Sequence, residues 1–236
     1  MTKLDSAAIQ KRQAWAERSG TQTYIDEMGR YAVERDEAIV RSLLGRGPGR
    51  LLDLPCGTGR FLEMEKELGF TITAADYSPT MMSVAKQHAG VEFVTADAFD
   101  PPFAPDTFDA ILIMRLLFHY ANPEAIVSAL AKSLKPGGRM VFDTLNRFST
   151  RWMASQVIGA CRKDPARRMY FETRASMGRK IEQAGLRVVE TRRAYLLPTR
   201  AYRRLPRVVT GLIDVCEKLT LPPLRVLTYW HVEKPR

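Results

Sequence analysis

Short apolar runs alternate along this chain with longer stretches in which apolar residues recur every three or four positions. The short runs have the length of strands, and the nearly continuous apolar run at 108–114 is typical of a strand buried on both faces. The predicted strands are 51–53, 71–75, 91–94, 108–114, 139–143, 188–197 and 226–233, and the predicted helices include 61–68, 123–134 and 170–184. Strands that alternate with helices predict an α/β fold around a mainly parallel sheet.

The first predicted strand leads into a turn of small residues, Asp53-Leu54-Pro55-Cys56-Gly57-Thr58-Gly59. Because Gly57 and Gly59 carry no side chain, backbone N–H groups of the turn can face a ligand at the positive end of the next helix. Pro55 donates no N–H, which leaves those contacts to Gly57 and its neighbours. Cys56 is interpreted as a small residue in a tight place rather than as a reactive thiol.

Acidic residues also follow the second and third predicted strands. Asp76 ends the second strand, 17 residues beyond Gly59, near the spacing at which a carboxylate reaches a ribose diol. A carboxylate suits this position because it can accept hydrogen bonds from both hydroxyls. The third strand leads into Asp97 and Ala98. The sequence therefore predicts a nucleoside-like ligand beside the glycine turn.

Taken together, these segments resemble the class I S-adenosylmethionine-dependent methyltransferases. The residues that carry the resemblance occur in the family's order and at its intervals: Asp53–Gly59, Asp76, Asp97-Ala98, Phe108-Asp109 and Leu134-Lys135-Pro136-Gly137-Gly138. Pro55 departs from the pattern, since the family turn usually has glycine there. The resemblance implies a Rossmann-like, doubly wound, seven-stranded sheet, mostly parallel with an antiparallel last strand, with helices on both faces. It also implies S-adenosylmethionine as the cofactor.

The same resemblance implies a role for individual residues. Asp53 helps to hold the methionine ammonium of the donor, Gly57 and Gly59 let the backbone approach it, and Asp76 holds the ribose hydroxyls. The other expected cofactor contacts are Pro55 and Cys56 in the turn, Tyr77, Asp97 and Ala98 around the adenine, and Met114 and Arg115 near the sulfonium.

Methyl transfer from a sulfonium is an in-line displacement, so it depends mainly on alignment, which can lower the barrier by about 7–11 kcal/mol. A hydroxyl or ammonium acceptor also needs a base. His119, which follows the fourth strand, is the candidate base, and a structural or positioning imidazole is the alternative. Tyr120 and Arg115 are further candidates for orienting the acceptor. No spacing typical of metal ligands is present, and this chemistry requires no metal.

We interpret residues 1–236 as one methyltransferase domain. Residues 1–45 form N-terminal cap helices, in which Tyr24 and Tyr31 either contact the substrate or pack on an amphipathic helix. Residues 46–143 form the cofactor-binding half.

Two segments, 144–169 and 199–223, break the alternation of strands and helices and are interpreted as substrate-side insertions. The string Thr144-Leu145-Asn146-Arg147 at the start of the first resembles a segment of the ubiquinone-pathway O-methyltransferases. This local resemblance favours a phenolic or lipid-like acceptor and makes Asn146 a candidate substrate contact.

The second insertion has apolar residues at helical spacing after a cluster of arginines: Val208, Leu212, Cys216 and Leu219 follow Arg200, Arg203, Arg204 and Arg207. A basic, amphipathic helix can dock on an anionic membrane. The alternatives are a helix that covers the domain's own core and a dimer contact.

Charge is unevenly distributed within the net +10 of the chain. Residues 1–146 hold 16 Lys and Arg against 19 Asp and Glu, whereas residues 147–236 hold 20 against 7. The basic half favours an anionic small molecule, an anionic membrane surface or, less readily, nucleic acid; an arginine-rich solvated surface is the alternative. The three cysteines, the polar N-terminus and the lack of an apolar run near ~20 residues lead us to expect a cytoplasmic protein.

The expected activity is therefore methyl transfer to an O, N or C nucleophile of a small molecule. The alternatives are an RNA methyltransferase and a non-catalytic regulator that binds S-adenosylmethionine. After the fourth strand the chain reads Met114-Arg115-Leu116-Leu117, without the Asn/Asp-Pro-Pro-aromatic motif of base-directed methyltransferases. The turn also lacks the third glycine of the dinucleotide fingerprint, which disfavours an oxidoreductase.

Overall fold

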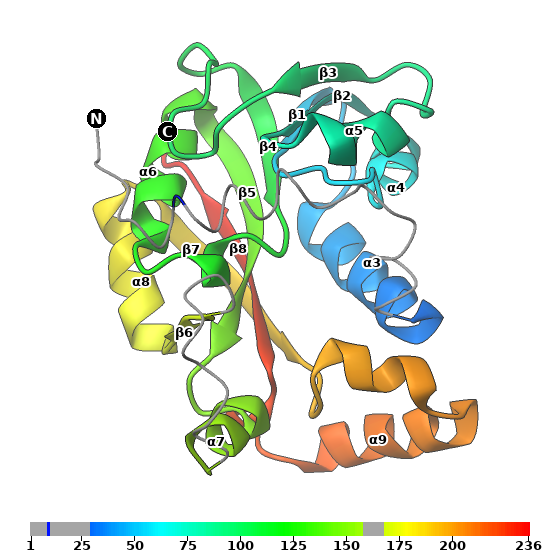
Figure 1. The fold of residues 1–236 in the computed structure, drawn as a ribbon. Helices are drawn as coiled ribbons and strands as arrows, with labels where there is room; N and C mark the ends of the chain where they lie inside the picture. The colour runs from blue at the N-terminus through cyan, green and yellow to red at the C-terminus, as the bar shows by residue number, and fades with distance from the viewer. Residues whose placement is uncertain (1–8, 10–28, 158–167) are drawn as a thin grey trace.

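A computed structural model describes residue 9 and residues 29–157 and 168–236 of the chain. Within these residues an eight-stranded sheet has the order β3-β2-β1-β4-β5-β8-β7, and β6 pairs with β5 (Figure 1). The strands are β1 (Gly49–Asp53), β2 (Phe70–Asp76), β3 (Glu92–Thr95), β4 (Phe108–Ile113), β5 (Leu134–Asn146), β6 (Phe171–Glu172), β7 (Arg187–Ala194) and β8 (Leu227–Glu233).

The pairing confirms a mainly parallel sheet with an antiparallel last strand. Strands β1 to β5 pair in parallel, and β8 lies antiparallel between β5 and β7. The sheet has eight strands rather than the predicted seven. The additional strand is the short β6, which forms at the start of the predicted helix 170–184. The helix begins later because the Thr173 hydroxyl caps it, accepting a hydrogen bond from the Ser176 N–H at 3.0 Å. Strand β5 also begins earlier than the predicted strand 139–143, at Leu134.

Helices cover both faces of the sheet, because neighbouring strand residues bury in opposite directions (Figure 1). Leu51 and Leu112 join one apolar cluster, whereas Leu52 and Ile111 join the other. On the first face lie α3 (Arg30–Leu44), α4 (Leu62–Glu67) and α5 (Pro79–Ala85), and on the second lie α6 (Pro123–Ser133) and α8 (Arg174–Gln183).

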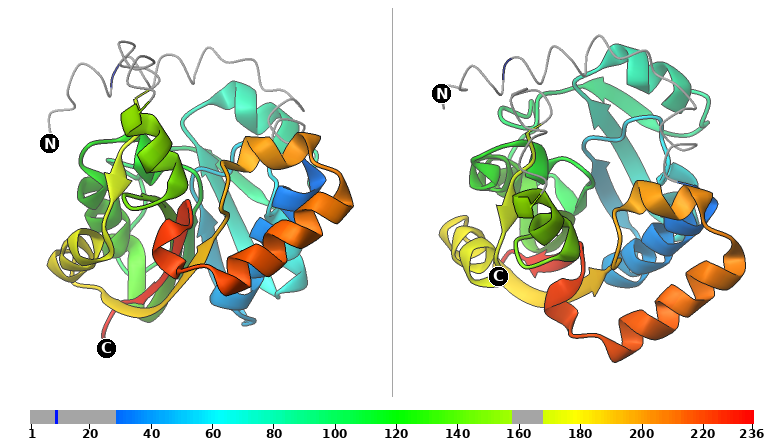
Figure 2. Two further views of the ribbon diagram at one scale, coloured as in Figure 1. Left: turned by 90° about the horizontal axis from the view of Figure 1, so that it is seen from below. Right: turned by 60° about the horizontal axis from the view of Figure 1, so that its bottom comes forward.

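Figure 1 places two further helices, α7 (Thr150–Val157) and α9 (Arg207–Leu219), at the bottom of the molecule, past the carboxyl end of β5. With short 3₁₀ helices at Leu117–His119, Thr199–Arg204 and Pro222–Leu224, they complete the helices of residues 29–157 and 168–236. Figure 2 shows α9 alongside α3, although the two helices are far apart in sequence. Among the helices of the described residues, none combines the length and the apolar character that crossing a membrane requires.

Candidate active site

A cavity of about 1050 Å³, its open mouth included, lies beyond the carboxyl ends of β1, β2 and β4. Its wall brings together most of the predicted cofactor residues: Pro55, Cys56, Gly57, Asp76, Tyr77, Asp97, Ala98, Met114 and Arg115. The candidate acceptor residues His119 and Tyr120 line the same cavity. The carboxyl edge of the sheet is where open α/β folds bind ligands.

Asp76 ties the glycine turn to the start of α5. Its Oδ2 accepts a hydrogen bond from the Gly57 N–H at 2.8 Å, and its Oδ1 accepts one from the Ser78 N–H at 2.8 Å. Burial raises the pKa of Asp76, and the backbone donors oppose that shift. Gly57 has a φ of +57°, a left-handed conformation that glycine adopts without strain. The glycine turn and the Asp76 carboxylate are therefore joined by a hydrogen bond where they line the cavity.

The adjoining wall is built from the loop after β3. Asp97 Oδ1 accepts a hydrogen bond from the Phe99 N–H at 2.9 Å, which fixes the direction of the loop. Ala96, Ala98 and Phe99 supply apolar surface beside it, and Tyr77 is an exposed aromatic residue on the same wall. A carboxylate beside small and aromatic residues suits a flat, polar-edged ring.

At the other end of the cavity, Arg115 has the unusual φ of +61°. Its N–H donates to Asp143 Oδ1 at 2.7 Å, and its Nη1 donates to Asp143 Oδ2 at 2.8 Å. Beyond it, the 3₁₀ helix at Leu117–His119 places His119 on the cavity wall. The Tyr120 ring meets the Phe99 ring edge-on, with the ring centroids 4.9 Å apart. The ring contact connects the 3₁₀ helix after β4 to the loop after β3 across the cavity wall.

Two predicted cofactor residues do not line the cavity. Gly59, with a φ of +84°, lies where helices pack: a Cβ there would come within 2.8 Å of Leu62 Cδ1 and 3.1 Å of Ala85 Cβ. Asp53 is wholly buried, and neither of its carboxylate oxygens has a hydrogen-bond partner among the described residues. The Glu65 carboxylate on α4 is also wholly buried, and neither of its oxygens has a hydrogen-bond partner among the described residues.

The pKa values of these two buried carboxyl groups, Asp53 and Glu65, are both raised. Burial raises the pKa of Asp53 well above its usual range, and the negative charge of Asp76 adds to the shift. Burial likewise raises the pKa of Glu65, and the charge of Asp53 adds to it. A cation brought close to these groups would stabilise their ionised forms.

The structure places two candidate substrate contacts away from the cavity wall. Tyr31 donates its hydroxyl hydrogen bond to Asp214 of α9, and Asn146 donates from Nδ2 to the carbonyl oxygens of Pro223 and Arg225 at 2.6 and 2.9 Å. Both residues thus hold the C-terminal segment in place. Tyr24 lies outside the described residues.

The sequence did not reveal the role of Asp36, a wholly buried residue of α3. Its carboxylate accepts hydrogen bonds from Arg60 and Arg115, both on the cavity wall, and from the hydroxyls of Tyr195 and Tyr229. Burial alone would raise the pKa of Asp36, but the charges of Arg115 and Arg60, with the two hydroxyls, lower it to about 2. Asp36 therefore stays ionised and holds two cationic side chains at the cavity.

A protein family described as "Methyltransferase domain" matches residues 52–142, the segment that contains the turn, Asp76, Asp97 and β4. The chain carries a class I methyltransferase domain. The family match, the curated relatives and the solved structures together confirm the predicted S-adenosylmethionine-dependent class and its Rossmann-like fold. Within residues 29–157 and 168–236, no group of three or more His, Cys, Asp or Glu residues could hold a metal ion.

Curated relatives of this methyltransferase chain include two ubiquinone biosynthesis O-methyltransferases. The protein of Xanthomonas campestris pv. campestris is 35% identical over 167 residues, 67% of this chain and 66% of the relative. The protein of Cereibacter sphaeroides is 39% identical over 116 residues, 47% of each chain. The chain thus spans about half to two thirds of the length of these relatives.

A solved methyltransferase structure shares the fold across the whole chain. The Burkholderia thailandensis 1,6-didemethyltoxoflavin-N1-methyltransferase, crystallised with 1,6-didemethyltoxoflavin and S-adenosylhomocysteine, has a TM-score of 0.64 and 19% identity. The match covers 100% of this chain and 93% of that one.

Proposed function

We propose that this protein transfers the methyl group of S-adenosylmethionine to the oxygen of a small, phenolic and lipid-like acceptor. The observation that carries the proposal is one cavity whose wall includes Asp76, Asp97 and His119. The names of the two curated relatives, which are O-methyltransferases of ubiquinone biosynthesis, support the reaction class.

The residues present fit the donor. Asp76 suits the ribose hydroxyls, Asp97 and the Ala98 N–H suit the edge of the adenine, and Tyr77 suits its face. Asp53, with two buried oxygens lacking a partner among the described residues, suits the methionine ammonium either directly or through water. Arg60 follows the glycine turn and lines the cavity, where its positive charge suits the methionine carboxylate. When bound, the donor supplies an electrophilic methyl group on a sulfonium.

The protein's part in the reaction is alignment and proton removal. The walls of the cavity hold the acceptor oxygen in line with the methyl group and exclude water. His119 accepts the proton of the acceptor hydroxyl as the oxygen attacks, and Tyr120 beside it orients the acceptor ring. Met114 packs near the reacting centre as part of the apolar wall.

Transfer of a labelled methyl group tests this proposal. The purified protein is incubated with methyl-labelled S-adenosylmethionine and with a phenol that bears an alkyl tail, and the product is analysed by mass spectrometry. The matched control acceptor has a hydrogen in place of the phenolic hydroxyl. We expect label on the phenolic oxygen only. Label that appears instead in an added transfer RNA pool, or on no acceptor although the donor binds, would contradict the proposal.

A further inference from the structure

Helix α9 packs against the protein with its polar side and turns its apolar side outward. Thr210 and Glu217 are buried, only 5% and 2% exposed, whereas Val208, Leu212 and Leu219 are 76%, 61% and 82% exposed. An ordinary surface helix does the opposite, burying its apolar stripe and exposing its charges. A cover helix was one alternative for this segment, and α9 covers the core with Thr210, Ile213 and Glu217 rather than with its apolar stripe.

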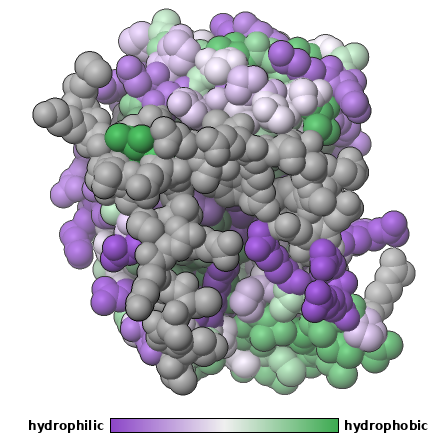
Figure 3. Space-filling model, in the orientation of Figure 1, coloured by the Kyte–Doolittle hydropathy of each residue, from purple (hydrophilic) through white to green (hydrophobic). Residues whose placement is uncertain are grey.

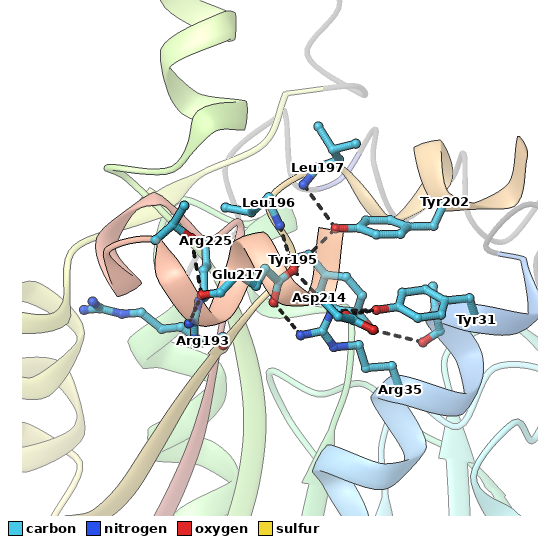
Figure 4. Close-up of polar contacts among 12 residues, drawn as sticks. Tyr31, Arg35, Arg193, Tyr195, Leu196, Leu197, Tyr202, Asp214, Glu217 and Arg225 are labelled. Carbon is cyan, nitrogen blue, oxygen red and sulfur yellow. Dashed lines mark hydrogen bonds and ion pairs between the residues drawn. The ribbon is translucent and has the colours of Figure 1, made fainter. Parts of the chain in front are cut away.

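Polar contacts fix the helix in this orientation (Figure 4). Arg35 of α3 forms ion pairs with Asp214, at 3.0 Å, and with Glu217. The Leu196 N–H donates to Glu217 Oε1 at 3.0 Å, and Arg225 Nη2 donates to the Glu217 carbonyl oxygen at 2.6 Å. Turning the apolar side inward would break all of these contacts and leave buried charges without partners.

The outward residues form one continuous stripe. Val208, Leu212, Val215 and Leu219 recur at steps of four, three and four residues, which places them on one side of a helix, and the 72%-exposed Leu221 extends the stripe past its end. We call these five residues the α9 face. Figure 3 shows apolar residues gathered at the lower right of the molecule, where Figure 1 places α9. A large, contiguous apolar patch of this kind marks an interaction surface.

Positive charge borders the α9 face. Arg203 and Arg204 are exposed immediately before the helix, and Lys218 is exposed on it. The segment 199–224 has two acidic residues, Asp214 and Glu217, and both are engaged by Arg35. In a symmetric contact between two copies, the positive residues that border the α9 face of one copy would face the same residues of the other and repel them. An anionic bilayer provides both an apolar acyl-chain region and negatively charged headgroups.

We propose that the α9 face docks this protein on an anionic lipid bilayer. The apolar side chains enter the boundary between headgroups and acyl chains, and Arg203, Arg204 and Lys218 meet lipid phosphates. This inference stands on the packing of α9 and does not depend on the acceptor assigned above.

Flotation of the full chain with lipid vesicles tests the proposal. Vesicles of phosphatidylcholine with 30% phosphatidylglycerol are compared with vesicles of phosphatidylcholine alone, at low and high salt. We expect binding that requires phosphatidylglycerol and weakens with salt. The double variant Leu212→Glu, Leu219→Glu should reduce the bound fraction at limiting lipid by about tenfold or more, because two side chains that enter the bilayer become charged. Arg203→Gln, Arg204→Gln should weaken binding less.

Matched control variants make the same kinds of change, an apolar residue to glutamate and basic residues to glutamine, at exposed positions outside α9. Val189→Glu adds a charge to an exposed apolar residue of β7, and Lys86→Gln with Arg187→Gln removes two exposed charges. These variants should bind like the wild type, and circular dichroism should show all variants folded. Wild-type protein that does not float, or binding unaffected by the α9 variants, would overturn the proposal. A concentration-dependent dimer in sedimentation, dispersed by Leu212→Glu, Leu219→Glu without vesicle binding, would overturn it in favour of a second copy.

Discussion

Arg60 Nη1 donates a hydrogen bond to Asp36 Oδ2 at 2.9 Å, which joins the cap helix α3 directly to the turn that lines the cavity. The Asp36 side chain is fully buried, and that of Arg60 is 9% exposed. Tyr195, on the far side, donates to Asp36 Oδ1 at 2.6 Å. One carboxylate therefore links helix α3, the turn after β1 and the two C-terminal segments that carry Tyr195 and Tyr229.

Replacing Asp36 by Asn should strongly destabilise the protein. Breaking a buried ion pair from one side leaves uncompensated charge and typically costs about 3–5 kcal/mol. Here Arg60 and Arg115 each lose the Asp36 carboxylate, and Arg115 keeps its ion pair with Asp143. Urea unfolding at pH 7 measures the change. Glu37→Gln is the matched control, since Glu37 neighbours Asp36 but pairs with Arg41 at the surface. An Asp36→Asn variant as stable as this control would contradict the role of Asp36.

The effect of Asp36 should also depend on pH. Its pKa is lowered to about 2, below the ~3.9 of an unfolded aspartate. The stabilisation is therefore fully present above about pH 4 and is lost as the pH falls toward 2. The difference in unfolding free energy between wild type and Asp36→Asn, followed from pH 6 to pH 2, should shrink over that window. A constant difference would show that ionisation of Asp36 does not matter.

Replacing Glu65 by Gln should stabilise the protein at neutral pH. The pKa of Glu65 is raised by burial and by Asp53, so the wild-type fold loses stability as the pH rises above the ~4.3 of an unfolded glutamate. The gain should be present at pH 7 and should shrink as the pH falls toward 4, where the unfolded glutamate is protonated as well. Glu63→Gln, on the exposed side of α4, should not reproduce it. Equal stability of Glu65→Gln and wild type at pH 7 would mean that Glu65 has a partner in solution.

Asp76→Ala should weaken donor binding by about 1–3 kcal/mol, the range for buried polar groups that lose a partner. Asp76 also holds the Gly57 and Ser78 N–H groups, so Asp76→Asn, which keeps the shape of the side chain, should be the milder change. Equilibrium dialysis with S-adenosylhomocysteine measures both, with Glu182→Ala on α8 as the control. Unchanged affinity in Asp76→Ala would remove Asp76 from the site.

His119→Ala should slow turnover far more than it weakens donor binding. A base role further predicts that the wild-type rate falls toward acidic pH as the imidazole is protonated, and that the variant loses this dependence. Rates and donor affinities measured across pH separate the two effects. His88→Ala is the control, because His88 pairs with Glu63 on the surface. A wild-type rate in His119→Ala at every pH would exclude the base role.

The sequence was sufficient to predict the sheet and most of the cavity wall, because both depend on local signals. Strand periodicity located β1 to β5, and the strand pattern placed Asp76 at the end of β2, where it lines the cavity. The role of Asp36 could not be predicted, since Tyr195 and Tyr229 meet it from more than 150 residues away. Nothing in the local sequence marks those residues as its partners.

The orientation of α9 was also beyond the sequence. Helical spacing shows that Val208, Leu212 and Leu219 share a face, but it does not show whether that face points inward. Arg35 decides the orientation by pairing with Asp214 and Glu217, and this long-range contact appears only in the folded structure.

Isothermal titration with S-adenosylmethionine and S-adenosylhomocysteine tests the central claim, that the turn after β1 and the acids after β2 and β3 hold the methyl donor. The account predicts saturable binding of one ligand per chain, weakened by Asp76→Ala and unchanged by Glu182→Ala. The absence of binding heat with both ligands, across temperatures at which the wild type is folded, would contradict it.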